Sequence, residues 1–427
     1  MEIAYKDALK APLVPPRCSV TALNRLETRN WDLIAAIPHC WDSRALEVLR
    51  DQLREMTGRT HIFLAPSARC AIAQVLSALP QTEVVMPAWT CPDVRTAVDL
   101  AGKDITYVDI DGASLNATSL QYADVARIGQ VLLPTHAFGI PTDIKRICDL
   151  ARERDCITIE DAAAAFPARI GNRLLGTYGD VGIISFERSK RVPSFRGAAI
   201  IVNNDKSIDI TKLDTPFVPT TRPLPVREAL FSVIHNLATV PWVYGRFAMP
   251  QALRRYSTNP LAEIPSPSLA ATSPSYVVAL HPYQAALATR VLKRIDKIRD
   301  HISSLVTVYQ QTLKGTGIQT FVPAGCDKAG LLRFPIAFPG RNRSEVLRSA
   351  LGRGLFLETN YEEPLPDATQ HEAFPSALWA AQNLIFLPLY ASLSVSAAER
   401  LALRLIDIHQ ETTPIPHEDV LSLPERE

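Results

Sequence analysis

Two side chains placed after neighbouring predicted strands carry the chemistry that this sequence offers. The apolar run Ile157 to Ile159 ends in the acidic pair Glu160-Asp161, and the run Val181 to Phe186 is followed by Lys190. Short β-branched runs bounded by Gly, Asp and Asn are typical of strands buried on both faces. An amine and a carboxylate presented together suit a pyridoxal phosphate site, where the amine forms the Schiff base and the carboxylate keeps the pyridine nitrogen protonated.

Both residues also have ordinary structural interpretations. A lysine in a chain with 45 lysines and arginines usually lies on the surface, but Lys190 follows a buried strand, which favours a functional position. Asp161 precedes the run Ala162 to Phe166 and could cap a helix there, because Asp is a favoured N-cap residue. The pairing of Asp161 with Lys190 favours the cofactor role for both.

Strand and helix patterns alternate between residues 61 and 204. The apolar runs predict strands at 61–64, 83–86, 105–108, 131–134, 157–159, 181–186 and 198–202. Repeated alternation implies right-handed crossovers and a mainly parallel sheet, whose ligands bind beyond the carboxyl ends of the strands. Five residues fall after predicted strands and are expected to rim one crevice: Ser67, Trp89, His136, Asp161 and Lys190.

Some of these residues could bind an anion or contact a cofactor. The free backbone N–H groups of a helix that begins near Ser67 form an anion site, to which Arg69 adds a cation. An ordinary capped helix is the simpler interpretation of this pattern. His136 fits a packing role and a cofactor or substrate contact equally well, whereas Trp89 fits the core better than a lid over the cofactor.

The composition argues against several classes of protein. The net charge is +1 without a basic block, so nucleic acid is not an expected partner. Seven scattered cysteines without metal-ligand spacing indicate free thiols in a reducing compartment and no metal site. The first residues carry acids and prolines rather than the apolar core of a signal peptide. A cytoplasmic protein without a membrane span is expected.

The 427 residues are expected to form two domains and an arm. The arm is Pro-rich and irregular over residues 1–40. A large cofactor-binding domain follows over residues 41–270. A small C-terminal domain covers residues 271–427 and begins with a long helical stretch from 275 to about 315.

The most apolar segment of the chain lies in the poorly patterned region 205–275. It runs from Leu230 to Tyr244 and is interrupted by polar residues. A packed or interfacial helix that Pro241 ends is the expected structure. Contact with a membrane surface is the alternative.

Stretches over most of residues 60–400 resemble, in order, the DegT/StrS sugar aminotransferases, which are pyridoxal phosphate enzymes of fold type I. The stretches are EVVMPAWT, TYVDID, LLPTHAFGIPTDI, ITIEDAAAAFPA, GTYGDVGIISFERSK, YQAA and IFLPLY. The resemblance implies an α/β fold with a large, mainly parallel sheet covered by helices on both faces, and a smaller C-terminal α/β domain. It also implies a homodimer with shared active sites.

The resemblance implies a role for each matching position. Lys190 matches the Schiff-base lysine, which then serves as the base for the proton shift, and Asp161 matches the partner of the pyridine nitrogen. Ser185 matches the hydroxyl that binds the cofactor phosphate, together with the helix start at Ala68-Arg69. The aromatic residue that stacks on the cofactor is expected near Cys91, where Trp89 is the candidate, and His136 is a further candidate contact.

The implied reaction is amino transfer from an amino-acid donor, Glu or Gln, to a keto group of a sugar or another small biosynthetic metabolite. Three positions depart from the pattern of the family or stand out beside the site: Arg69, Ala164 and Arg196. They motivate an alternative in which a diverged member catalyses elimination, decarboxylation or condensation. A non-catalytic homologue is a third possibility, against which the presence of both Lys190 and Asp161 argues.

Overall fold

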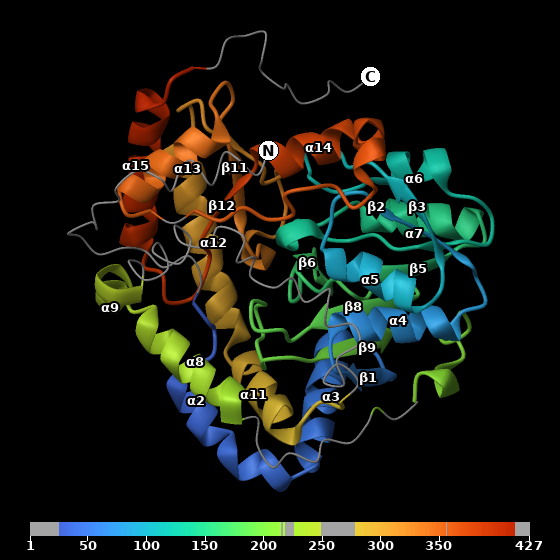
Figure 1. Ribbon diagram of the computed structural model, residues 1–427. Helices are drawn as coiled ribbons and strands as arrows, with labels where there is room; N and C mark the ends of the chain where they lie inside the picture. The colour runs from blue at the N-terminus through green and yellow to red at the C-terminus, as the bar shows by residue number, and fades with distance from the viewer. Residues whose placement is uncertain (1–24, 215–216, 218–225, 249–277, 356, 415–427) are drawn as a thin grey trace.

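A seven-stranded sheet forms the centre of the large domain (Figure 1). The computed structural model describes residues 25–214, 217, 226–248, 278–355 and 357–414. The strands in spatial order are β1 (Ile62–Ala65), β9 (Ala198–Val202), β8 (Val181–Ser185), β5 (Ile157–Asp161), β4 (Val131–Leu132), β2 (Glu83–Pro87) and β3 (Asp104–Val108). Strands β3, β2, β4, β5 and β8 are parallel, whereas β9 is antiparallel to both β8 and β1. The mainly parallel sheet is therefore confirmed.

Helices cover both faces of this sheet because side chains alternate between the faces along each strand. In β9, Ala198, Ile200 and Val202 pack in one cluster with α4 (Ala68–Ala78) and α5 (Pro92–Leu100). Ala199 and Ile201 belong instead to the cluster that holds α3 (Arg44–Thr57) and α11 (Pro282–Leu292). On the other edge of the sheet, α6 (Ser119–Val125) and α7 (Ile144–Glu153) pack against β2, β3 and β4.

The C-terminal part is a smaller α/β unit around a three-stranded antiparallel sheet. Its strands are β10 (Gln319–Thr320), β11 (Phe334–Ala337) and β12 (Ile385–Leu387), and its helices are α12 (Ile295–Leu313), α13 (Arg343–Gly352), α14 (Pro375–Asn383) and α15 (Val395–Glu411). The helical stretch expected from 275 to 315 is two helices, because Arg294 leaves the helical conformation and donates to Asp32. Short elements complete the chain: β6 (Arg169–Ile170), β7 (Arg173–Leu174), η2 (Ala137–Gly139), η3 (Ile210–Lys212), η7 (Lys328–Gly330) and η8 (Ala368–Ala373).

The end of the expected N-terminal arm is helical rather than irregular. Residues 30–41 form α2 (Asn30–Ala35) and η1 (Ile37–Trp41), which pack against α11. The arm prediction for residues 1–24 lies outside the described residues. The apolar segment after residue 225 forms α8 (Val226–Ala238), α9 (Pro241–Val243) and η4 (Tyr244–Ala248), and α8 lies beside α2 (Figure 1). No helix in the described part of the chain is long and apolar enough to cross a bilayer.

The two units meet at a close backbone contact that requires glycine. The amide of Leu332 donates to the carbonyl of Phe138 over 2.7 Å. Gly139 has a φ of +87°, and a Cβ atom there would overlap the carbonyl oxygen of Gly330. The loop after β4 can therefore lie directly on the backbone of the C-terminal unit.

Substituting Gly139→Ala is expected to destabilise the protein by about 1–3 kcal/mol more than Gly102→Ala. Both glycines have positive φ, but a Cβ atom at Gly102 meets nothing within 4 Å. The difference between the two variants in urea unfolding isolates the cost of forcing the two units apart. Equal unfolding free energies would contradict the close contact.

Candidate active site

Asp161 and Lys190 meet beyond the carboxyl ends of β5 and β8. Asp161 is the last residue of β5, and Lys190 lies five residues beyond the end of β8, its parallel neighbour. Burial raises the pKa values of Asp161, Asp93 and Cys91, and the charge of the nearby Lys190 ammonium opposes the rise at all three groups. The structure therefore brings together the two residues on which the sequence-based hypothesis depends.

The two oxygens of the Asp161 side chain have different surroundings. Burial raises the pKa of this carboxyl, while a hydrogen bond from the Ala163 amide and the nearby Lys190 charge oppose the rise. The Ala163 N–H donates to Oδ1 over 2.9 Å. Among the described residues, no group donates to Oδ2. One oxygen is thus fixed by the backbone and the other can accept a proton or a hydrogen bond from a ligand.

A tight turn after β8 places Lys190. The amide of Glu187 donates to Ser185 Oγ over 3.2 Å, and the amide of Lys190 donates to the Glu187 carbonyl over 2.9 Å. Ser189 donates through its amide and its hydroxyl to the Glu187 carboxylate. Ser185 is itself buried. The Lys190 amine, in contrast, makes no hydrogen bond or ion pair with the described residues, so it is available for reaction.

The next residue, Arg191, anchors this turn to distant segments. Its guanidinium forms a buried ion pair with Glu27 over 2.7 Å. It also donates to the carbonyls of Leu331 and Leu389 over 2.6 and 3.2 Å. Burial lowers the pKa of Arg191, and the charge of Glu27 opposes this effect. The sequence analysis missed Arg191 and Glu27, because 164 residues separate them.

The start of α4 has the geometry of the expected anion site. Ser67 is the N-cap, and its hydroxyl accepts from the Cys70 amide over 3.2 Å. Ala68 and Arg69 form the first turn, where backbone N–H groups have no partner within the helix. The buried Arg69 guanidinium lies 3.6 Å from Asp93. Arg69 therefore balances a carboxylate of the protein as well as adding positive charge to the site.

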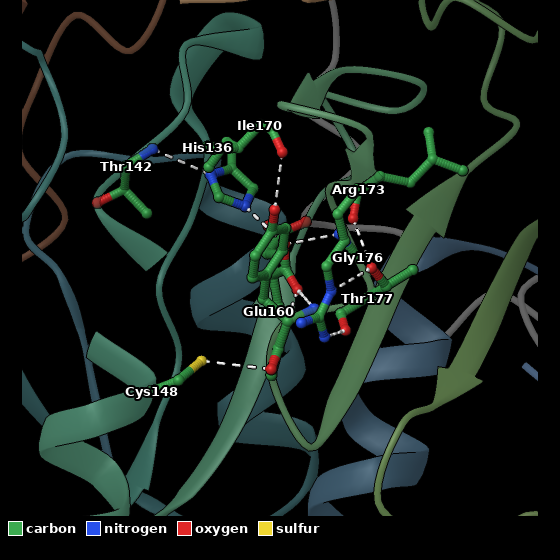
Figure 2. A network of polar contacts seen from close by, with 12 residues as sticks. His136, Thr142, Cys148, Glu160, Ile170, Arg173, Gly176 and Thr177 are labelled. Carbon is green, nitrogen blue, oxygen red and sulfur yellow. Dashed lines mark hydrogen bonds and ion pairs between the residues drawn. The ribbon is translucent and has the colours of Figure 1, made fainter. Parts of the chain in front are cut away.

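His136 belongs to a buried polar network centred on Glu160 (Figure 2). The Thr142 amide donates to His136 Nδ1 over 3.1 Å, so the ring proton sits on Nε2, which donates to Glu160 Oε1 over 3.0 Å. Glu160 also accepts from the amides of Gly176, Tyr178 and Gly179. Both nitrogens of His136 are thus engaged by protein groups, and its backbone amide donates to the Asp161 carbonyl over 3.2 Å.

Glu160 had no assigned role in the sequence analysis, although the Glu160-Asp161 pair was visible. Adjacent residues of a strand point to opposite faces, so only one of the two carboxylates can face the Lys190 amine. Glu160 instead faces the backbone of the segment between β7 and β8, where Gly176 and Tyr178 donate to it (Figure 2). The alternation of side chains along a strand could therefore have indicated from the sequence that Glu160 and Asp161 have different roles.

Trp89 lies in an aromatic cluster that positions Tyr361. Its indole N–H donates to the Tyr361 carbonyl over 2.8 Å, and its ring meets Tyr361 edge-on at 5.7 Å. Tyr361 has a φ of +51°, and its side chain lies close to Cys91 and Asp161. Burial raises its pKa well above the ordinary value. Tyr361 is a candidate site residue from the C-terminal unit, and nothing in the local sequence indicated it.

Arg196 follows the Lys190 turn and is half-buried. Its carbonyl accepts from the Ser194 hydroxyl over 2.7 Å. Gln284 of α11 donates to the Ser194 carbonyl over 3.1 Å, and Phe195 stacks on Tyr283. The segment that follows Lys190 is therefore held by α11.

Substituting Glu160→Gln is expected to cost about 2–4 kcal/mol of unfolding free energy. The new NH₂ group would face backbone N–H groups that now donate to a carboxylate. Urea unfolding measures the loss, and Glu153→Gln on the exposed end of α7 is the matched control. A loss no larger than that of the control would contradict the network.

Substituting Asp161→Asn in the cofactor-free protein is expected to change how stability depends on pH. Because burial raises the pKa of Asp161, the folded state retains this proton above the pKa of the unfolded chain, about 4. The wild type therefore loses stability as pH rises through that window. Asn does not ionise, so the advantage of the variant should widen from acid to neutral pH. A pH-independent difference in urea unfolding would refute this.

Comparison with solved structures confirms the expected fold type I architecture. DesI, solved in the presence of its TDP-sugar product, is similar with a TM-score of 0.69 and 16% identity, over 96% of this chain and 97% of that chain. A GDP-4-keto-6-deoxymannose-3-dehydratase, solved with a trapped PLP-glutamate geminal diamine, is similar with a TM-score of 0.69 and 17% identity, over 90% of this chain and 100% of that one.

Sequence comparison points in the same direction. The UDP-N-acetyl-3-dehydro-alpha-D-glucosamine 3-aminotransferase of Acidithiobacillus ferrooxidans is 29% identical over 171 residues, which cover 39% of this chain and 45% of the relative. The match thus spans less than half the length of that relative. The family model of the DegT/DnrJ/EryC1/StrS aminotransferases matches residues 44–405. The chain belongs to this family.

Proposed function

We propose that the protein is a pyridoxal phosphate-dependent aminotransferase. The observation that carries this proposal is the convergence of Lys190 and Asp161 beyond neighbouring parallel strands. The amine has no partner among the described residues, and Asp161 presents one oxygen without a donor there. Family membership over residues 44–405 supports the same conclusion.

The residues of the site fit the chemical groups of this cofactor. Asp161 would hold the ring nitrogen in its protonated form, which lets the bound cofactor withdraw electrons from the substrate. Lys190 would attach the cofactor through its amine and afterwards carry the proton between substrate carbon atoms and the cofactor. Ser185 and the first turn of α4, at Ala68 and Arg69, would bind the phosphate.

Two further residues fit the same site less directly. The contacts of Trp89 suggest that it fixes Tyr361 beside the cofactor. His136 would support Asp161 through its position next to the carboxylate, since its ring nitrogens are engaged by Thr142 and Glu160. Both residues would therefore position the cofactor-binding groups.

The proposed acceptor is the keto group of a nucleotide-linked sugar, with Glu or Gln as amino donor. This follows from the relative in Acidithiobacillus ferrooxidans, whose name specifies a UDP-linked 3-keto sugar. It agrees with DesI, which was solved with a TDP-sugar product. A cytoplasmic, biosynthetic role as a homodimer with shared active sites completes the proposal.

Elimination is the second candidate reaction. Ala164 supplies only a methyl group three residues after Asp161, and a dehydratase shares the fold. Analysis of the sugar product after incubation of the cofactor-loaded enzyme with both amino donor and keto sugar separates the two outcomes. A transaminase forms an aminated sugar and one oxo acid for each amino group transferred, whereas an enzyme that only eliminates water forms a dehydrated sugar without the new amino group.

Substituting Lys190→Ala should abolish the borohydride-trapped link between protein and added pyridoxal phosphate. It should lower amino transfer by several orders of magnitude, because the amine both attaches the cofactor and moves the proton. Absorption spectra and mass spectrometry of the reduced protein measure the link. Lys206→Ala, in an exposed turn, is the control. A wild-type protein that forms no such link would refute the proposal.

A further inference from the structure

An open cavity of about 730 Å³ lies beside the β6–β7 hairpin. Its walls come from the end of α3, the start of α7, the hairpin and the segment that follows the hairpin. The side chains that matter below are those of Arg59, Lys145, Arg169, Arg173, Thr177 and Tyr178. The volume falls in the range of roughly 300–1,000 Å³ that is typical of small-molecule sites. We call this site the hairpin cavity.

The hairpin cavity lies on the other face of the sheet from the proposed cofactor site. Side chains alternate along β5, so Ile159 and Asp161 point toward the face that α4 and α5 cover, and Glu160 points the opposite way. Glu160 accepts from the amide of Tyr178 over 2.7 Å, and Tyr178 lines the cavity. The cavity is therefore separate from the site at Lys190.

Every charged side chain that lines the hairpin cavity is a cation. The four cations are Arg59, Lys145, Arg169 and Arg173. Among the residues that the structure describes, no Asp or Glu lines the cavity, and none of the four cations forms an ion pair. Other half-buried arginines of the protein have a carboxylate partner, as Arg299 has Asp327 over 2.9 Å. The positive charge of the cavity thus lacks a counterion in the described part of the chain.

Two of the cations are held together although their charges repel. Arg59 Nη2 donates to the Thr177 carbonyl over 3.2 Å. Arg173 donates to the same carbonyl through Nη2 and to the Thr177 hydroxyl through Nε (Figure 2). Arg59 Nε is buried and has no hydrogen-bond partner in the described ranges. Burial lowers the pKa of Arg59, and the charge of Arg173 lowers it further. A bound anion would relieve both effects.

The other two cations leave most of their N–H donors unused. Lys145 makes no side-chain hydrogen bond with the described residues, and the Arg169 guanidinium donates only to the Asn172 carbonyl there, over 2.7 Å. A guanidinium has five donors in a planar fork, and an ammonium group has three. Phosphate oxygens are acceptors that match both the arginine fork and the lysine point charge.

We propose that the hairpin cavity binds a small anion that carries at least two phosphate groups. One phosphate group carries about two negative charges at neutral pH, half of what four cations can balance. Two linked phosphates therefore match the charge of the cavity better than one. The cavity volume also leaves room for an organic group attached to the phosphates.

The charges that border the cavity favour a small ligand over an extended polyanion. On α3, Arg54 pairs with Asp51 over 2.7 Å. On α7, Arg152 pairs with Asp149. These helices thus carry mixed charges outside the cavity, whereas a strand of nucleic acid needs a basic surface that continues along its backbone.

Calorimetric titration of the full-length protein with inorganic pyrophosphate tests this proposal. Wild type should bind pyrophosphate both with and without added pyridoxal phosphate, more tightly than orthophosphate, and more weakly as ionic strength rises. The double variant Lys145→Gln, Arg169→Gln should bind roughly tenfold less tightly or weaker still, because it loses two charged donors. The matched control is Arg348→Gln, Arg400→Gln, which removes two exposed charges from α13 and α15.

Hydrogen exchange of the wild type locates the bound anion without any substitution. Pyrophosphate should slow amide exchange in residues 169–178. The proposal is overturned if wild type does not bind pyrophosphate, if orthophosphate binds as tightly, if the cavity variant binds as tightly as the control variant, or if exchange slows only around α4. Borohydride trapping at Lys190 reports separately on the proposed enzyme function.

Discussion

The buried ion pair between Arg191 and Glu27 is the interaction on which the active-site geometry depends. Arg191 directly follows Lys190 and also binds the carbonyls of Leu331 and Leu389. Glu27 accepts from the Ala391 amide as well. One guanidinium therefore joins the N-terminal segment, the turn that carries Lys190 and the C-terminal unit. Removing either partner would leave a buried charge without compensation, and such a charge is strongly destabilising.

The site also depends on the different surroundings of two adjacent carboxylates. Glu160 is saturated by three backbone amides and the imidazole of His136, so it is committed to structure. Asp161 receives one backbone donor and keeps the other oxygen open toward Lys190. The imidazole of His136 donates to Glu160 through Nε2, so it belongs to the Glu160 network. Glu160 therefore holds the surrounding backbone in place, while Asp161 keeps one oxygen available for a ligand.

The sequence predicted the parts of the molecule that follow from local pattern. The strands that end in Asp161 and precede Lys190 were recognisable from short β-branched runs, and parallel order then implied that the two residues converge. The helix that begins after Ser67 was recognisable from its cap. Family resemblance supplied the roles of these positions, and the comparisons confirm the family and the fold.

Contacts between distant segments could not be predicted in this way. Glu27 and Arg191 are 164 residues apart in the chain, and Tyr361 reaches Cys91 only through docking of the C-terminal unit. Helix α8 shows a related limit. A helix was expected over the apolar segment and is present, but the sequence does not state which side of it faces the protein.

The position of Phe231 brings the outer helix α8 to the turn that carries Lys190. The Arg188 guanidinium lies 4.2 Å above the Phe231 ring, and Lys190 follows two residues later. A substitution that removes this ring would therefore change the surroundings of the Lys190 turn without touching Lys190 itself.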